Sequence, residues 1–139
     1  MIYLIGSLQN RYIPELARDL RATGREVFDD WQSAPSADLE WQDYERARGR
    51  TYQEAMAGAH ARNVVGFDKA HLDRCSAGVL VLPAGKSGHL ELGYLIGRGT
   101  PAFILLAGEP YRFDIMYGLA TGIVASEDEL IAALNQAGV

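Results

Sequence analysis

The chain is short of the residues that build disulfides and metal centres. It has one cysteine, Cys75, so no disulfide can form within its 139 residues, and a lone thiol is typical of a reducing compartment. Its three histidines do not have the helical spacing of a zinc-protease motif, and Cys75 has no second cysteine beside it. The sequence therefore predicts neither a disulfide framework nor a metal site.

Long apolar runs and an excess of positive charge are also missing. No stretch approaches the roughly 20 apolar residues of a membrane span, and the first apolar run, Ile2-Tyr3-Leu4-Ile5, is too short for a signal peptide. The net charge of −5 argues against a nucleic-acid polymer or a membrane surface as partner, whereas a small ligand remains open. We expect one cytoplasmic domain over residues 1–139.

Apolar strands alternate with amphipathic segments along the chain. Strands are predicted at 2–5, 26–29, 78–82, 102–106 and 123–125. Helices are predicted near 13–24, 67–74, 90–98 and 126–134, and the stretch 38–60 is helix-permissive but interrupted by glycines. This alternation is typical of an α/β fold, with helices covering both faces of a parallel sheet.

A loop of small residues, Ala84-Gly85-Lys86-Ser87-Gly88, follows the clearest strand. The backbone N–H groups at the start of the next helix can bind an anion or a hydroxyl. The loop is not an ATP-binding phosphate loop, because Leu80 occupies the position of that motif's first glycine. Gly6-Ser7 follows the first strand, and ligands bind beyond the carboxyl ends of such strands, so we expect both loops to border one crevice.

Glu91 is expected in the first turn of the helix after this loop. With Gly88 as the N-cap, Glu91 is the third helical residue, where a carboxylate can simply cap the helix. Alternatively, a carboxylate fixed in a crevice attacks a sugar carbon, as in glycosidic bond cleavage through an oxocarbenium-like transition state. That chemistry needs a proton donor, for which Asp68 is the leading candidate. The simpler interpretations are a solvent-facing Asp68 and a Tyr3 that fills the core.

Two segments resemble the nucleoside 2-deoxyribosyltransferase superfamily, which includes the 2′-deoxynucleoside 5′-monophosphate N-glycosidases and CMP-type nucleosidases. They are Ile2-Tyr3-Leu4-Ile5-Gly6-Ser7 and Ser87-Gly88-His89-Leu90-Glu91-Leu92-Gly93-Tyr94, and the similarity extends through Asp68, the 78–82 strand and Gly99-Thr100-Pro101. The resemblance implies a flavodoxin-like (Rossmann-like), five-stranded parallel sheet. It also implies an enzyme without cofactor or metal, and a homodimer in which a neighbouring chain completes each site.

The same resemblance implies roles for individual residues. Glu91 matches the glutamate that attacks the anomeric carbon, Tyr3 the tyrosine that positions it, and Asp68 the aspartate that helps to protonate the base. The residues expected around the sugar and its 5′ group are Gly6, Ser7, Lys86, Ser87, Gly88 and His89. Asp114 and Met116 lie in the region expected to reach across to a neighbouring chain.

One departure from the family pattern bears on the substrate. The transferases usually carry an aspartate shortly before the Gly-Thr that leads to the glutamate, whereas the loop 84–87 has no acid. Without that charge, Lys86, Ser87 and Ser7 suit a 5′-phosphate better than a free 5′-hydroxyl. The sequence therefore predicts cleavage of the N-glycosidic bond of a (deoxy)nucleoside 5′-monophosphate. The alternatives are base exchange on free deoxynucleosides and a nucleotide-binding module without catalysis.

Overall fold

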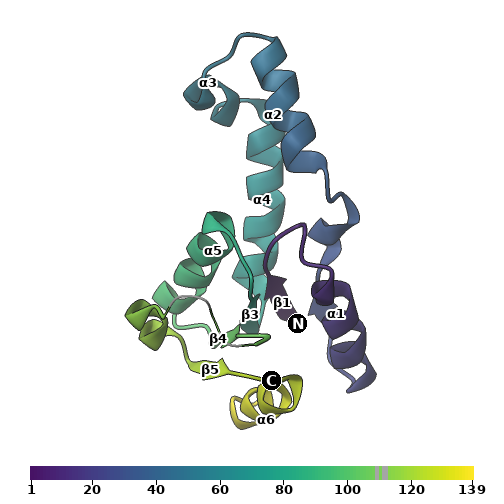
Figure 1. Ribbon diagram of the computed structural model, residues 1–139, viewed down its shortest axis with the longest axis vertical. Coiled ribbons are helices and arrows are strands. Elements are labelled where there is room, and N and C mark those ends of the chain that lie inside the picture. Colours follow the sequence, from purple (N-terminus) through teal and green to yellow (C-terminus); the bar gives the residue numbers. More distant parts are fainter. Residues whose placement is uncertain (109, 111–112) are drawn as a thin grey trace.

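A five-stranded parallel sheet forms the centre of the computed structural model, which describes residues 1–108, 110 and 113–139 (Figure 1). The strands are β1 (Ile2–Ile5), β2 (Val27–Phe28), β3 (Ala77–Val81), β4 (Ala102–Leu105) and β5 (Gly122–Val124). They lie in the order β2-β1-β3-β4-β5, and every neighbouring pair is parallel. This is the flavodoxin-like order, so the predicted fold class is confirmed.

Helices cover both faces of the sheet. They are α1 (Tyr12–Ala22), α2 (Ala37–Ala47), α3 (Tyr52–Met56), α4 (Ala59–Arg74), α5 (Lys86–Gly97) and α6 (Glu127–Gln136), with 3₁₀ turns η1 (Asp30–Ser33) and η2 (Ile115–Leu119). Helices α1 and α6 pack on one face, and α5 with the end of α4 packs on the other. Within the described residues, no helix is both long and apolar enough to cross a membrane.

The alternation of side chains along β1 divides the core between the two faces. Ile2 and Leu4 pack with α1 and α6, whereas Tyr3 and Ile5 pack with α4 and α5. Gly78 of β3 lies opposite Tyr3 in the register. The strand pattern therefore directs the Tyr3 side chain to the same face of the sheet as Glu91 and Asp68.

Two helices begin earlier than the sequence predicts. Helix α4 begins at Ala59 rather than near 67, because Gly58 takes an extended conformation and serves as its N-cap. Helix α5 begins at Lys86 rather than 90, with Gly85 as the N-cap. Gly88 therefore lies inside the helix, where an added Cβ would be 3.1 Å from both Ile5 Cγ2 and Leu80 Cδ1. Gly88 therefore allows α5 to pack closely on the sheet, and it does not cap the helix.

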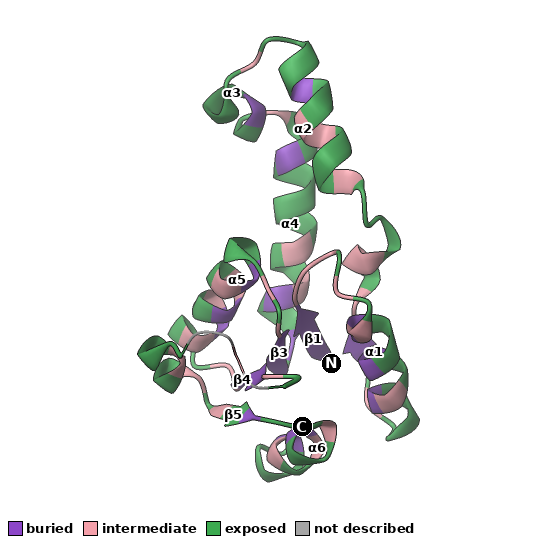
Figure 2. Cartoon of the chain, viewed as in Figure 1, coloured by how far each residue is buried: buried purple, intermediate pink, exposed green. Residues whose placement is uncertain are grey.

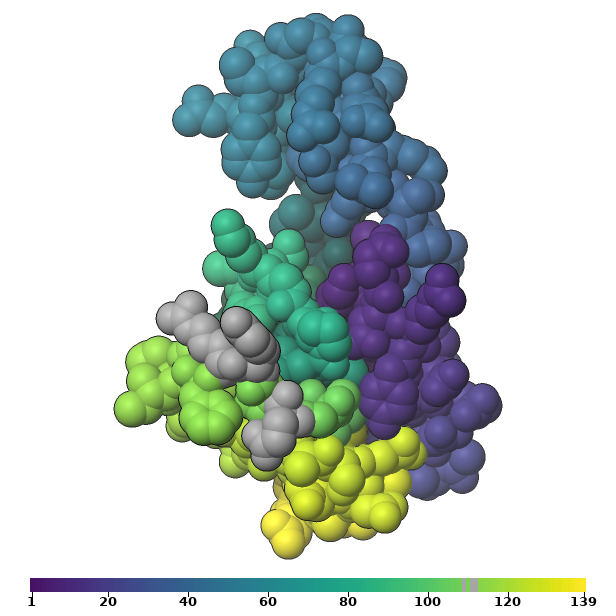
Figure 3. Space-filling model, viewed as in Figure 1, coloured from purple at the N-terminus to yellow at the C-terminus, as the bar shows by residue number. Residues whose placement is uncertain are grey.

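Residues 37–66, comprising α2, α3 and the first half of α4, extend away from the sheet as an arm (Figure 1). Most of the arm is exposed, and its buried residues are Glu45, Ala55 and Ala61 (Figure 2). Glu45 forms a salt bridge with Arg50 at 3.1 Å. In the space-filling view the molecule is notched between the arm and α5 (Figure 3).

Candidate functional site

Tyr3, Asp68 and Glu91 come from three elements and meet on one face of the sheet. Tyr3 is on β1 and is 1% exposed. Asp68 lies on α4 and Glu91 on α5, and both are half-buried. The charges of both carboxylates act on the Tyr3 hydroxyl, and the charge of Asp68 acts on Glu91. The fold thus brings together the three residues that the sequence singled out for catalysis.

Glu91 is not an N-terminal cap of its helix. Because α5 begins at Lys86, Glu91 lies in the second turn, and the first turn of α5 contains no acidic residue. The third helical position, where a capping carboxylate would stand, is occupied by Gly88. Within the described part of the chain, no hydrogen bond joins Glu91 to the start of α5 or to Tyr3. The capping interpretation of Glu91 is therefore wrong.

Burial raises the pKa of both carboxyl groups. For Glu91, burial and then the nearby charge of Asp68 raise the pKa to about 7. Burial also raises the pKa of Asp68, where His71 acts to lower it and Asp38 to raise it. Burial, with the charges of Glu91 and Asp68, raises the pKa of the Tyr3 hydroxyl, which keeps it protonated. The two carboxyl groups therefore titrate above their ordinary range, and the charge of Asp68 makes Glu91 harder to ionise.

One oxygen of Asp68 has no hydrogen-bond partner. The Oδ1 atom is buried, and no described residue donates to it. A buried polar atom without a partner is costly, so it is a natural place for a proton or for a ligand's donor group. Two other titratable side chains of α4, Asp73 and His71, make contacts elsewhere. Asp73 is bonded to Lys69 and Arg98, and the His71 ring stacks on Phe28 at 3.9 Å.

The loop after β1 passes very close to β3. A Cβ at Gly6 would overlap the δ-carbon of Ile13 and lie 3.3 Å from the Val81 carbonyl oxygen, so any larger residue would force the Ile13 side chain to shift. The Ser7 hydroxyl accepts a hydrogen bond from the Gln9 N–H at 3.2 Å. Gly6 and Ser7 thus lie at the junction of β1 and β3, where flavodoxin-like sheets bind their ligands.

The other predicted binding residues lie at the start of α5. Lys86 and Ser87 are exposed, and a shallow depression of about 610 Å³ is lined by Ala84, Gly85, Lys86, His89 and Leu90. His89 faces η2, where its Nε2 lies 2.8 Å from the Tyr117 hydroxyl while its Nδ1 contacts the Gly85 carbonyl at 2.7 Å. The carbonyl requires a donor at Nδ1, so in the neutral ring Nε2 accepts the Tyr117 proton.

Asp114 and Met116 lie at the start of η2. The Asp114 carboxylate accepts a hydrogen bond from the Met116 N–H at 3.0 Å, which caps the turn. The Met116 side chain is 60% exposed and Asp114 is exposed as well. Within one chain, both residues are therefore on the surface.

The sequence did not single out the residues that hold the loop after β1. Trp31 donates its indole N–H to the Leu4 carbonyl at 2.9 Å, and the Gln32 amide donates to the Ser7 carbonyl at 3.0 Å. Asn10 lies on the loop itself and contacts the end of β3. Asparagine just before a helix is a capping signal, which is the one feature of this group that a sequence can show.

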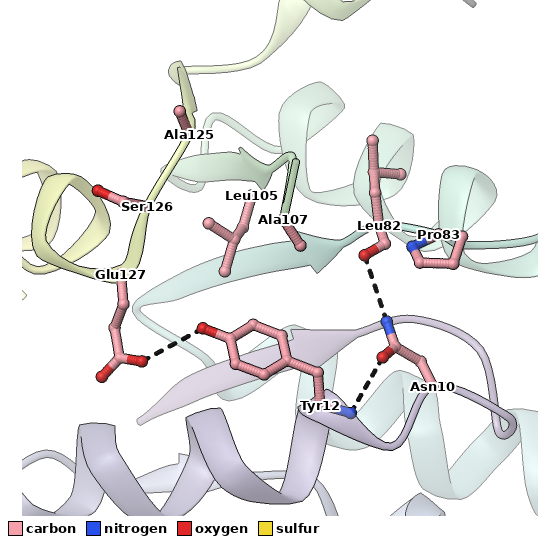
Figure 4. Close-up of a pocket in the computed structure, with 9 residues that line it drawn as sticks. All are labelled: Asn10, Tyr12, Leu82, Pro83, Leu105, Ala107, Ala125, Ser126 and Glu127. Carbon is pink, nitrogen blue, oxygen red and sulfur yellow. Dashed lines mark hydrogen bonds between the residues drawn. The ribbon is translucent and has the colours of Figure 1, made fainter. Parts of the chain in front are cut away.

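A second cavity lies away from Glu91. This cavity, of about 390 Å³, lies between the starts of α1 and α6, and Tyr12 donates a hydrogen bond to Glu127 across it at 3.2 Å (Figure 4). Its wall includes Asn10, Leu82 and Pro83. Nowhere in the described residues do three or more His, Cys, Asp or Glu side chains gather as a metal site.

Comparison with known proteins adds no relative. No protein-family model matches the chain, and a search of the curated proteins finds no match. The candidate site is therefore argued from its geometry and from the short motifs that it contains.

Proposed function

We propose that this protein cleaves the N-glycosidic bond of a (deoxy)nucleoside 5′-monophosphate, with Glu91 as the nucleophile. The observation that carries the proposal is a half-buried carboxylate with no capping role, placed beside Asp68 and Tyr3 on one face of the sheet. Perturbed carboxyl pairs of this kind are typical of sites that use one group as acid and the other as nucleophile. The resemblance to the nucleoside 2-deoxyribosyltransferase superfamily supports the same assignment.

In the first step, ionised Glu91 bonds to C1′ of the sugar while the bond from C1′ to the base breaks. The bonding electrons leave with the nucleobase, and the nucleobase takes a proton from Asp68. The raised pKa of Asp68 favours the protonated acid that this step needs. In the second step, water attacks C1′, Glu91 departs as a carboxylate, and Asp68 takes the proton of the water. Tyr3, held protonated, positions Glu91.

The 5′-phosphate is proposed to bind where the loop after β1 faces the start of α5. The N-terminal turn of α5 provides backbone N–H groups and the positive end of a helix dipole. Lys86 and Ser87 provide a charge and a hydroxyl there, and Ser7 provides a second hydroxyl from the opposite loop. Because the phosphate is anionic, this end of the crevice complements it, while the buried carboxyl groups lie on the side of the glycosidic bond.

The protein is proposed to act as a homodimer. Several large apolar side chains near α5 and η2 are exposed in the single chain: Leu90, Phe113, Ile115, Met116 and Leu119. Exposed apolar groups that cluster in this way favour an interface. A second copy on this surface would bring Asp114 and Met116 towards the neighbouring site, as the family resemblance implies.

The test is to incubate the protein with a panel of nucleosides and their 5′-monophosphates and to separate the released bases by chromatography. We expect base release from monophosphates, none from the Glu91→Gln variant, and normal release from Glu15→Gln, which alters an exposed glutamate on α1. Base exchange only when a free base is added would indicate a transferase instead. Binding of monophosphates with no base released would identify a module without catalysis and refute the proposal.

A further inference from the structure

Asn10 joins the two loops that border the candidate site. Its side-chain Oδ1 accepts a hydrogen bond at 3.1 Å from the N–H of Tyr12, the first residue of α1, and Asn10 thus supports the helix start from just before its N-cap, Arg11. Its Nδ2 is directed at the end of β3, 3.4 Å from both the Val81 and the Leu82 carbonyl oxygens. Figure 4 shows the side chain between the start of α1 and Leu82. One amide group therefore both supports a helix start and bridges to a neighbouring strand.

The backbone of Asn10 is tied to two further segments. Its N–H donates to the Ser7 carbonyl at 2.9 Å, and its carbonyl accepts from the Ile13 N–H at 3.3 Å. The Gln32 amide, on η1, donates to the same carbonyl at 3.4 Å and to that of Ser7 at 3.0 Å. The position of Ser7 is thus set by Asn10 and Gln32 together.

The bridge from Asn10 reaches β3 at the point where the chain leaves the sheet for α5. Leu82 is followed by Pro83, which has no N–H to donate, and then by Ala84 and the N-cap Gly85. On the other side of the bridge, a Cβ added at Gly6 would lie 3.3 Å from the Val81 carbonyl oxygen, so the loop passes close to the end of β3. The side chain of Asn10 therefore ties the Ser7 loop to the segment that carries Lys86 and the rest of the α5 N-terminus.

We propose that Asn10 is a positioning residue that fixes the spacing between Ser7 and the N-terminus of α5, and so seats the 5′ end of the substrate. The inference rests on the proposed function, because it assumes that these two loops hold the 5′-phosphate. Asn10 acts through backbone carbonyls and takes no part in bond cleavage. A looser spacing weakens the hold on a monophosphate more than on a free nucleoside, which has no phosphate to be held between the loops.

Asn10→Ser is the test variant, because serine retains an oxygen that can accept a hydrogen bond from the start of α1 but has no amide to bridge to β3. Gln9→Ala is the matched control. Gln9 is an exposed amide on the same loop, and its side chain donates to the Pro35 carbonyl at 3.2 Å rather than to β3. Should Asn10→Ser fail to fold, Gln32→Met removes the donor to the Ser7 and Asn10 carbonyls and permits the same comparison.

We expect kcat/KM of Asn10→Ser for a deoxynucleoside 5′-monophosphate to fall at least about tenfold, mostly through KM, and that for the free deoxynucleoside to fall less than about threefold. Amide hydrogen exchange of residues 6–10 and 84–88 should accelerate by at least about fivefold. Gln9→Ala should change neither quantity by more than about twofold. A folded Asn10→Ser protein with wild-type kcat/KM, or with equal losses on both substrates, would overturn the proposal.

The two proposals can fail separately. If the wild-type protein releases no base, the proposed function fails. The positioning role is then tested by amide hydrogen exchange and by the Kd for the same monophosphate, measured by calorimetry. A weaker Kd together with faster exchange in Asn10→Ser supports the positioning role. Unchanged values of both overturn it.

Discussion

Replacing Glu91 with glutamine should stabilise the folded protein at neutral pH while it abolishes base release. The reason is that the carboxylate is half-buried beside Asp68, and burial together with that charge disfavours the ionised form. Glutamine has the same shape and no charge, so it removes this cost without leaving a cavity. If removing the charge of Glu91 stabilises the fold but abolishes turnover, the carboxylate serves function rather than folding.

The magnitude follows from the pKa of Glu91, which rises from the usual 4.5 to about 7 in the folded chain. A rise of this size corresponds to at most about 3.5 kcal/mol, because each pKa unit is worth about 1.4 kcal/mol. Below pH 4.5 both states carry the proton, so the folded state bears no cost. Between pH 4.5 and about 7 the unfolded state loses its proton first, and the stability of the wild type declines. Above that window the difference is constant.

The assay is urea unfolding of the wild type and of Glu91→Gln at a series of pH values from about 4 to about 9. The variant's advantage in free energy of unfolding should be near zero at the acidic end and should grow across the window to at most about 3.5 kcal/mol. Glu15→Gln, at an exposed position, should follow the wild type within about 0.5 kcal/mol. An advantage that does not change with pH, or a variant less stable than the wild type above pH 7, would refute the reasoning.

Four further substitutions test other parts of the structure. Gly6→Ala should destabilise the protein by about 1–3 kcal/mol in urea unfolding, because its Cβ would overlap Ile13, whereas Gly93→Ala on the open face of α5 should stabilise it by about 0.5–1 kcal/mol. Asp68→Asn should slow base release by about 100-fold or more in chromatographic assays. It should also flatten the alkaline limb of the pH–rate profile, because the proposed proton donor is gone. Glu45→Ala should cost at most about 3 kcal/mol in thermal or urea unfolding, since it leaves an arginine of the arm without its partner; no loss would show that the ion pair does not hold the arm.

The sheet could be predicted from the sequence because buried parallel strands are short apolar runs. The run at 78–82 corresponds to β3 (Ala77–Val81), and that at 102–106 to β4 (Ala102–Leu105). The first half of α4 could not be predicted in the same way. These residues extend from the sheet with solvent on most sides, so they have no regular apolar spacing. Gly66, in the middle of α4, also lowers the helix propensity of the segment.

The start of α5 shows where a sequence pattern has two physical meanings. Gly88 was interpreted as an N-cap, because glycine is common at helix ends, but it is required by the approach of Ile5 and Leu80 beneath the helix. That contact joins residues distant in the sequence and becomes visible only once the sheet is assembled. Because the helix begins at Lys86, Glu91 lies out of capping range, and this follows from packing beneath the helix rather than from the residues next to Glu91.

The arrangement of charge around Tyr3 is costly unless it serves a ligand. Glu91 and Asp68 are half-buried side by side, each raises the pKa of Tyr3, and neither forms a salt bridge with a described residue. Elsewhere the same helices do pair their acids: Asp73 of α4 bonds Arg98 at the end of α5 at 2.7 Å. The fold thus has cations available to α4 and α5, yet within the described residues it forms no salt bridge with this pair, and only the charge of His71 acts to lower the pKa of Asp68. A transition state with positive charge on the sugar ring would supply the missing charge, which is the physical argument for the proposed glycosidic chemistry.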